Sequence, residues 1–245
     1  MKNRNTITTT FALAALAMLL FVSAAPAAIL EQEQAFSGNP NFLRTLTFDK
    51  FDDQGGLATL NSIEYIFTLD NTGGILVLDN DGEQPASGNY EFGTKASLMS
   101  FDVPMVNALS MPVTGVLTAY NTGTFSLAAD VGDSSGDWDP SGPDGIQIDG
   151  TIQSDSDSGF INATAFSQYT GTGTFDVLAS ANQWFDFEGV SGVEGATTPS
   201  SVAGSVKILY NYAGGTPVPE PATMILFGSG LMGLGAIGRR RKGKG

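Results

Sequence analysis

The chain of 245 residues contains no cysteine and no histidine. Without cysteine no disulfide can form, and without either residue zinc and most transition metals lose their usual ligands. Nucleophilic catalysis by a serine or cysteine that is paired with histidine is excluded for the same reason. These absences rule out several hydrolase and metalloenzyme classes before any motif is considered.

Basic residues are also scarce, because 11 Lys and Arg face 25 Asp and Glu. Seven of the 11 lie near the chain ends, so the body between about residues 28 and 218 has four basic and 24 acidic residues, a net charge near −20. This charge excludes nucleic acid as a partner, since binding needs cations that neutralise phosphates. It also disfavours anionic membrane surfaces, favours solubility, and makes divalent cations reasonable bridging partners.

Long hydrophobic runs occur only near the two ends. Ala222–Gly238 contains 17 residues without a charge, at the short end of the roughly 17–25 that span a bilayer. The cluster Arg239, Arg240, Arg241 and Lys242 follows at once, which predicts that this end stays in the cytoplasm. Pro219, Glu220 and Pro221 precede the run, and the prolines favour a rigid, extended segment.

This tail resembles the PEP-CTERM signal, the C-terminal sorting element of exported proteins in Gram-negative, polysaccharide-producing bacteria. The resemblance rests on Pro219-Glu220-Pro221, on Ala222-Thr223-Met224, on the Gly- and Leu-rich run 226–238 and on the basic cluster. It implies that a membrane-embedded cysteine transpeptidase, the exosortase, recognises the tail and cuts near Pro-Glu-Pro. The alternative is a plain C-terminal membrane anchor.

The N-terminus has the features of an export signal. Lys2 and Arg4 precede the apolar run Phe11–Val22, and small residues follow up to Ala28. This order predicts a signal peptide over residues 1–27 that is cut near Ala27 by signal peptidase after entry into the general export machinery. The alternative is a retained anchor. The precursor would be held transiently in the inner membrane, with its body exported.

The body, residues 28–216, is predicted to be a single all-β domain ahead of the sorting tail 217–245. Ile63–Asp70 and Val206–Tyr212 alternate apolar and polar residues, the pattern of half-buried strands. Further strands are expected over residues 43–51, 75–78, 90–101, 113–120, 124–129, 146–152, 172–178 and 184–187, separated by turn-forming residues. Short strands of this kind favour a β-sandwich of jelly-roll type.

The body also resembles the choice-of-anchor E domain, a group of exported and variously anchored bacterial proteins. The resemblance rests on Phe48–Asp52 with Gly56–Ile63, on Tyr169–Phe175 and on Gly204–Tyr212, and it spans about residues 42–213. It implies a surface or matrix domain of unknown biochemical activity and transfers no catalytic residues.

Residues 130–159 are expected to form an irregular acidic loop. Asp133, Asp137, Asp139 and Asp144, or the segment Asp79–Glu83, offer the oxygen ligands that calcium prefers, although neither fits the EF-hand pattern. The alternative is a solvated loop whose charges keep a sheet edge from pairing with neighbours. No cofactor other than calcium is expected.

Two tryptophans are candidates for carbohydrate contact. Trp138 lies within the acidic loop and would be exposed, whereas Trp184, beside Phe185 and Phe187, is predicted to lie in the core. Hydrolysis by two carboxylates is the remaining hydrolytic chemistry, with Glu64 on a strand and Glu188 and Glu194 in turns. With so many acidic residues the sequence does not select a pair.

The expected function is therefore that of an exported, non-enzymatic protein of the cell surface or extracellular matrix, processed by exosortase and associated with exopolysaccharide. A calcium-assisted carbohydrate-binding module is the first alternative, and a carboxylate glycosidase is the second.

Overall fold

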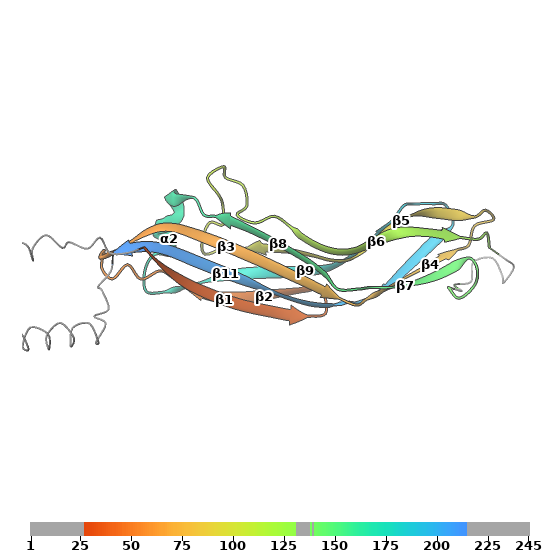
Figure 1. Cartoon of the computed structure of the whole chain (residues 1–245), viewed down its shortest axis with the longest axis horizontal. Coiled ribbons are helices and arrows are strands. Elements are labelled where there is room, and N and C mark those ends of the chain that lie inside the picture. Colours follow the sequence, from red (N-terminus) through yellow and green to blue (C-terminus); the bar gives the residue numbers. More distant parts are fainter. Residues whose placement is uncertain (1–26, 131–137, 139, 215–245) are drawn as a thin grey trace, which may run out of the picture.

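The computed structural model describes residues 27–130, 138 and 140–214, which are mostly β, as the sequence predicts (Figure 1). Its elements are the strands β1 (Ala28–Gly38), β2 (Phe42–Asp49), β3 (Ala58–Thr72), β4 (Ile75–Asn80), β5 (Ala86–Met99), β6 (Leu117–Leu127), β7 (Gly145–Asp149), β8 (Gln153–Phe160), β9 (Thr174–Phe187), β10 (Val193–Thr198) and β11 (Ser201–Gly214), with the 3-10 turn η1 (Ala163–Ala165) and the helix α2 (Phe166–Tyr169).

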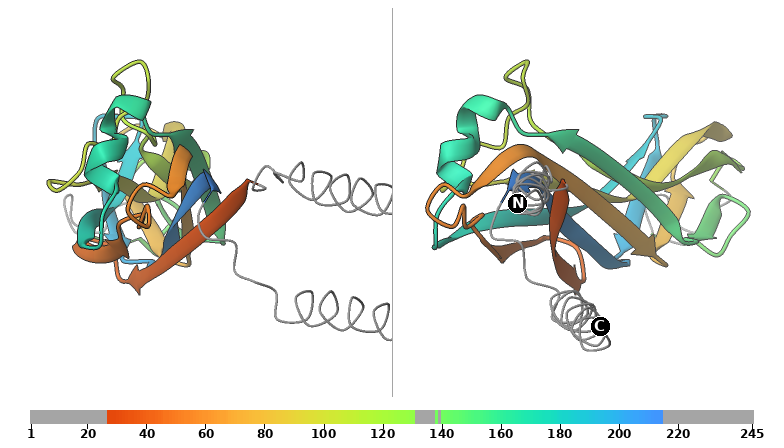
Figure 2. Two further views of the ribbon diagram at one scale, coloured as in Figure 1. Left: turned by 90° about the vertical axis from the view of Figure 1, so that its left-hand side faces the viewer. Right: turned by 60° about the vertical axis from the view of Figure 1, so that its left-hand side comes forward.

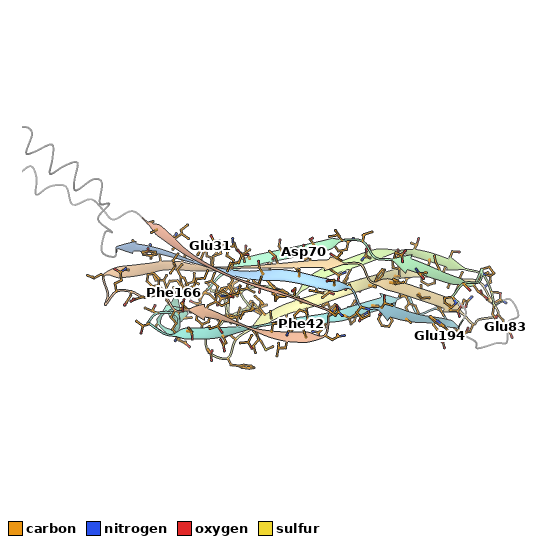
Figure 3. All side chains as sticks on the ribbon, turned by 90° about the horizontal axis from the view of Figure 1, so that it is seen from below. Glu31, Phe42, Asp70, Glu83, Phe166 and Glu194 are labelled. Atoms are coloured by element: carbon orange, nitrogen blue, oxygen red, sulfur yellow. The ribbon has the colours of Figure 1, made fainter. Side chains whose placement is uncertain are left out.

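The strands form three antiparallel sheets. The first has the order β1-β11-β3-β8, the second β2-β9-β5-β6, and the third β10-β4-β7. The molecule is elongated, and β4 and β7 lie at the end opposite the free ends of β1 and β11 (Figures 1 and 2). Glu83 and Glu194 mark this distal end in Figure 3, far from Glu31 and Phe166.

The alternation predicted over residues 63–70 is confirmed in β3. Ile63, Tyr65, Phe67 and Leu69 are fully buried, because every second side chain of a strand points to the same face. Val206, Ile208 and Tyr210 on the neighbouring β11 do the same. These residues form the inner face of the first sheet.

The second sheet supplies the other half of the same core. Val177, Ala179 and Ala181 of β9 are fully buried, together with Phe48 of β2 and Leu117 of β6. Two four-stranded sheets thus bury one common hydrophobic core, an arrangement that agrees with the predicted β-sandwich. Further along β9, the residues at the alternate positions 182, 184 and 186 face outward.

A smaller core lies at the distal end, between the third sheet and the ends of β5, β6 and β9. Its buried members are Leu76, Leu78, Ala86, Phe92, Phe125 and Leu127. Buried polar residues lie between the two cores. On β5, Thr94 stands between Phe92 of the smaller core and Ala96 of the larger core, and its hydroxyl donates to Asn71 Oδ1 at 2.8 Å.

The side chain of Ser200 also donates to Asn71, and Asn121 Oδ1 accepts from the backbone N–H of Thr151 at 2.9 Å. We call the buried polar set Asn71, Thr94, Asn121 and Ser200 the polar belt. Buried polar groups are usually hydrogen-bonded. In the belt the Asn71 side-chain oxygen is bonded, whereas its side-chain nitrogen has no partner among the described residues.

The edges of the two large sheets are joined by side chains. Asp157 Oδ2 accepts from the backbone N–H of Gly115 at 2.6 Å, and Asp155 Oδ2 accepts from that of Thr118 at 2.7 Å. These bonds connect β8 of the first sheet to the beginning of β6 in the second. On the opposite side, Gln32 of β1 bonds to the backbone of Asp49 in β2.

Several strand predictions need correction. Residues 113–120 and 124–129 were predicted as separate strands, but residues 117–127 form one strand. Gly123 lies within this strand opposite Tyr90, and a Cβ at position 123 would be 2.5 Å from the Tyr90 hydroxyl. A side chain there would therefore require Tyr90 to move. Likewise, the strands predicted over residues 172–178 and 184–187 are parts of the single strand β9.

The strand predicted over residues 146–152 corresponds to β7 at residues 145–149. The expectation of an irregular loop is wrong for residues 153–160, which form β8. β8 has the sequence Gln-Ser-Asp-Ser-Asp-Ser-Gly-Phe, without the apolar alternation of a half-buried strand. Its carboxylates bond to backbone of the other sheet instead, which explains why an acidic segment forms a strand.

Candidate functional site

The predicted calcium ligands are only partly within the described chain. Asp133, Asp137 and Asp139 lie outside the described residues. Asp144 is buried, and its carbonyl oxygen accepts from the backbone N–H of Asn80 at 3.0 Å. The fold therefore brings Asp144 against the other candidate segment, Asp79–Glu83, at the distal end. Within residues 27–130, 138 and 140–214, no three acidic side chains cluster closely enough to hold a metal ion.

Asn80 organises this distal turn. Its side-chain nitrogen donates to the carbonyl oxygens of Ala128 at 2.6 Å and Gln84 at 3.0 Å, and its side-chain oxygen accepts from Gly82 N–H at 3.1 Å. These bonds hold together segments that are far apart in sequence.

Trp138 is exposed, with 45% of its surface accessible, as predicted for a loop tryptophan.

The prediction that Trp184 lies in the core is wrong. Trp184 follows the buried Ala181 by three positions along β9, so alternation places it on the outer face of the second sheet. Its side chain is 36% exposed. Phe185, its neighbour, faces the opposite side. Three aromatic residues within residues 184–187 suggested a core segment, but they divide between the two faces.

Trp184 is held in place by two charged residues of β5. Its indole Nε1–H donates to Glu91 Oε1 at 2.8 Å, and Lys95 Nζ lies 3.2 Å from the centroid of its ring. Lys95 Nζ also lies 5.7 Å from the ring centroid of Tyr120 on β6. A cation above an aromatic face is attracted by the ring quadrupole, so Lys95 links the two aromatic side chains.

Gly93 lies between the two aromatic residues. It is directly opposite Trp184 on β9 and Tyr120 on β6. A Cβ at this position would collide with the carbonyl oxygen of Ala119, so the backbone requires glycine. Position 93 therefore contributes no side chain between the two aromatic residues, and Lys95 is the β5 side chain that contacts both rings. We call Trp184, Tyr120, Lys95, Glu91 and Gly93 the aromatic cluster.

The hydroxyl of Tyr120 is buried and has no hydrogen-bond partner among the described residues. Burial and the charge of Glu91 raise the pKa of Tyr120 well above its usual value, so the phenol remains protonated at neutral pH.

An open hollow of about 480 Å³ lies on the sheet beside the aromatic cluster. Residues of β5, β6 and the end of β9 line it, among them Tyr90 and Phe187. Its polar members are Asn89, Glu91, Thr122, Thr124, Asp186 and Glu188. Glu91 belongs to both the hollow and the aromatic cluster. The hollow thus offers carboxylates, hydroxyls and an amide next to two aromatic rings.

Of the carboxylates predicted for glycoside hydrolysis, only Glu188 lies in this hollow. Glu64 is on β3 of the first sheet, and Glu194, expected in a turn, is in β10. Sequence reasoning missed Glu91 and Asp186. Their positions follow from strand register, since Glu91 pairs with Asp186 and Thr122, and this register is not visible in the sequence alone.

The two ends of the described domain lie side by side. Ala28, the first residue of β1, pairs with Tyr212 near the end of β11, and the two strands run together in Figure 2. β11 ends at Gly214. Pro219, Glu220, Pro221 and the basic residues Arg239, Arg240, Arg241 and Lys242 lie outside the described residues, as does the run Ala222–Gly238. Within the described part of the chain, no helix is long and apolar enough to cross a membrane.

Residues 217–242 match the PEP-CTERM protein-sorting motif. The match confirms the sorting tail predicted from the sequence and begins only three residues after Gly214. The PEP-CTERM motif implies export, membrane anchoring before cleavage, and an exosortase as the processing partner. A search among curated proteins gives no match.

The structure was also compared with solved structures. A chain of infectious bursal disease virus, Gx strain, is 14% identical and has a TM-score of 0.17, with 78% of this chain and 38% of that chain covered. The VP2 subviral particle of the same virus is 13% identical, with a TM-score of 0.17, and the match covers 78% of this chain and 38% of that chain. Desmodium yellow mottle tymovirus is 7% identical, with a TM-score of 0.17, and the match covers 79% of this chain and 92% of that chain. The chain thus spans about two fifths of the infectious bursal disease virus chains that it matches.

Proposed function

We propose that this protein is an exported, non-enzymatic component of the cell surface or extracellular matrix, cut by exosortase at its PEP-CTERM tail and associated with exopolysaccharide. The observation that carries the proposal is the match over residues 217–242, placed directly after a finished domain. A cut near Pro219 removes no residue of any described strand. The released product would therefore be an intact domain.

The pairing of Ala28 with Tyr212 supports the same proposal. A signal peptide cut near Ala27 and a tail cut near Pro219 would both leave from one end of the domain. The elongated body would then extend away from the membrane while the precursor is tethered there. The absence of cysteine and histidine and a body charge near −20 suit a soluble, extracellular role without nucleophilic catalysis.

We further propose that the domain is a jelly-roll sandwich of the surface type suggested by its resemblance to choice-of-anchor E. Without β4, β7 and β10, which form the third sheet, eight strands remain in two sheets. Numbered one to eight along the chain, they have the orders 1-8-3-6 and 2-7-4-5, as expected of two interleaved Greek keys.

Intact-mass measurement of the protein from its own host, with and without exosortase, tests the sorting proposal. We expect a C-terminus near residues 217–221 in the wild-type strain and retention of the whole tail without exosortase. Replacing Pro219, Glu220 and Pro221 by alanine should also retain the tail, whereas Pro217→Ala, outside the triplet, should not. A chain still ending at Gly245 in both strains would refute processing and leave a plain membrane anchor.

A carbohydrate-binding module is the second candidate function, and the exposed aromatic cluster beside a polar hollow favours it. Calcium remains part of this proposal through Asp133, Asp137, Asp139 and Asp144, and Trp138 remains a candidate sugar contact. Glycan pull-down with and without calcium tests both points. Equal retention in both conditions would rule out calcium assistance, and unchanged retention of Trp138→Ala would rule out that contact.

A further inference from the structure

We propose that the outer face of the second sheet binds an uncharged glycan chain, with Trp184 and Tyr120 as the contacts for sugar rings and the adjoining hollow as the contact for hydroxyl groups. The inference deepens the matrix association proposed above and rests on it for the source of the glycan. The first argument is the arrangement of the rings. Adjacent strands lie about 4.8 Å apart, so the backbone positions of Trp184 and Tyr120, on either side of Gly93, are about 10 Å apart.

Position 93 has no side chain, and the Lys95 side chain lies over the ring of Trp184. Two linked sugar rings would lie across β5, one against the surface of each aromatic ring that Lys95 leaves uncovered. Sugar rings expose C–H groups on their flat faces, and these groups are attracted to the electron-rich face of an aromatic ring.

The second argument is that Trp184 is already held in one orientation. Its Nε1–H bond to Glu91 and the Lys95 ammonium above its ring fix a side chain that remains 36% exposed. A preorganised contact loses less conformational entropy on binding than a freely rotating one. Two charged residues thus hold a large aromatic side chain in one orientation at the surface.

The third argument is the polarity of the hollow. Glu91, Asp186 and Glu188 supply acceptors for sugar hydroxyls, and Thr122 and Thr124 supply hydroxyls that both donate and accept. Lys95 is the only basic residue on β5, β6 and β9, and its ammonium lies over the Trp184 ring. Three carboxylates without a free counter-charge repel acidic polysaccharides, so the surface fits a glycan without carboxylate or sulfate groups.

The test uses the protein purified from its host, either processed or as the full chain in detergent. Trp138→Phe leaves Trp184 as the only tryptophan, so fluorescence then reports on this face alone. We expect a saturable change in Trp184 emission with neutral β-glucan or dextran oligosaccharides or with the neutral fraction of the host polysaccharide. Polygalacturonate, an acidic chain, should give none.

Calorimetry on variants then locates the site. Trp184→Ala should weaken binding roughly tenfold or more, as expected when a central aromatic contact is truncated. Phe185→Ala is the matched control, since it lies at the next position with similar exposure and faces the other side of the sheet. Thr122→Arg places a large side chain in the hollow and leaves the tryptophan unchanged, and it should weaken binding to the same extent. This second variant keeps the inference testable if Trp184→Ala does not fold.

Three outcomes would overturn the inference: equal affinity of Trp184→Ala and wild type, binding of the acidic chain only, and no binding of any neutral glycan. None of them bears on tail processing, which the mass measurement decides. Conversely, neutral-glycan binding at Trp184 by a protein that keeps its tail would support this site and still refute exosortase processing.

Discussion

Gln32 of β1 and Asp49 of β2 are joined by two hydrogen bonds between the two large sheets. The side-chain nitrogen of Gln32 donates to the carbonyl oxygen of Asp49 at 3.0 Å, and the backbone N–H of Asp49 donates to the side-chain oxygen of Gln32 at 2.8 Å. One side-chain amide thus occupies the position of a neighbouring strand. An unpaired strand edge can pair with another chain and lead to aggregation. The Gln32 amide satisfies one backbone N–H and one carbonyl group on the edge of β2.

Gln32→Ala should lower the free energy of unfolding by about 1 kcal/mol, because two partly exposed hydrogen bonds are lost. Gln34→Ala, two residues along the same strand and exposed, should have little effect. Urea unfolding followed by circular dichroism measures both. Equal stability of the two variants would show that the Gln32 bonds do not stabilise the closed edge.

Asp157→Ala should destabilise the opposite edge by about 1–3 kcal/mol, since it leaves the backbone N–H of Gly115 without its charged acceptor. Ser156→Ala, on the other face of β8, is the control. Thermal unfolding measures the difference, and added calcium should not restore the loss. Recovery by calcium would contradict a purely structural role for this carboxylate.

Asn71→Ala should lower the free energy of unfolding by about 2 kcal/mol, because it removes the acceptor that serves both Thr94 and Ser200 in the polar belt. Thr94→Val, which removes one hydroxyl and preserves the shape, should cost less. Chemical denaturation of both variants tests this order. A larger loss of unfolding free energy for Thr94→Val than for Asn71→Ala would contradict this order. It would show that Thr94 contributes more than Asn71 to the stability of the polar belt.

The buried tyrosines predict loss of stability at alkaline pH. Burial raises the pKa of Tyr169 to about 12, and burial raises the pKa values of Tyr65 and Tyr210 as well. In the unfolded chain tyrosine ionises near pH 10. The folded state therefore keeps protons that the unfolded state releases, so stability is complete below about pH 10 and falls as pH rises towards about 12.

Tyr169→Phe removes one of these ionising groups. Unfolding at alkaline pH should then release about one proton fewer, so stability should fall less steeply as pH rises. It also removes the hydrogen bond from Tyr169 to the Pro104 carbonyl, so stability at neutral pH should drop by about 1 kcal/mol. Urea unfolding across the alkaline range measures both effects. An unchanged slope would mean that Tyr169 does not ionise on unfolding in this range.

The strands with apolar alternation could be predicted from the sequence, and those stabilised by polar contacts could not. Residues 63–70 show a clear period of two, and β3 buries the predicted face. β8 lacks that period because Asp155 and Asp157 bond to a partner strand instead of packing in a core. β1 buries only Phe36 deeply and was missed for a similar reason.

The sorting tail was predictable because its parts are contiguous in sequence, and residues 217–242 match. The aromatic cluster was not, since Glu91 and Trp184 are 93 positions apart and meet only through strand register. The orientation of Trp184 depended on which residue of β9 faces the core. With aromatics at positions 184, 185 and 187, hydrophobicity alone gave no answer.

The central place of β11 in the first sheet has a consequence for the order of assembly. β11 lies between β1 and β3, so the first strand of the domain gains its only in-sheet neighbour when the last strand arrives. Every contact of β1 in that sheet spans more than 160 positions, and such distant closures make folding slow. Until then the chain exposes unpaired edges. The first sheet can therefore close only when the last residues of the domain, just before the PEP-CTERM match, are available for pairing.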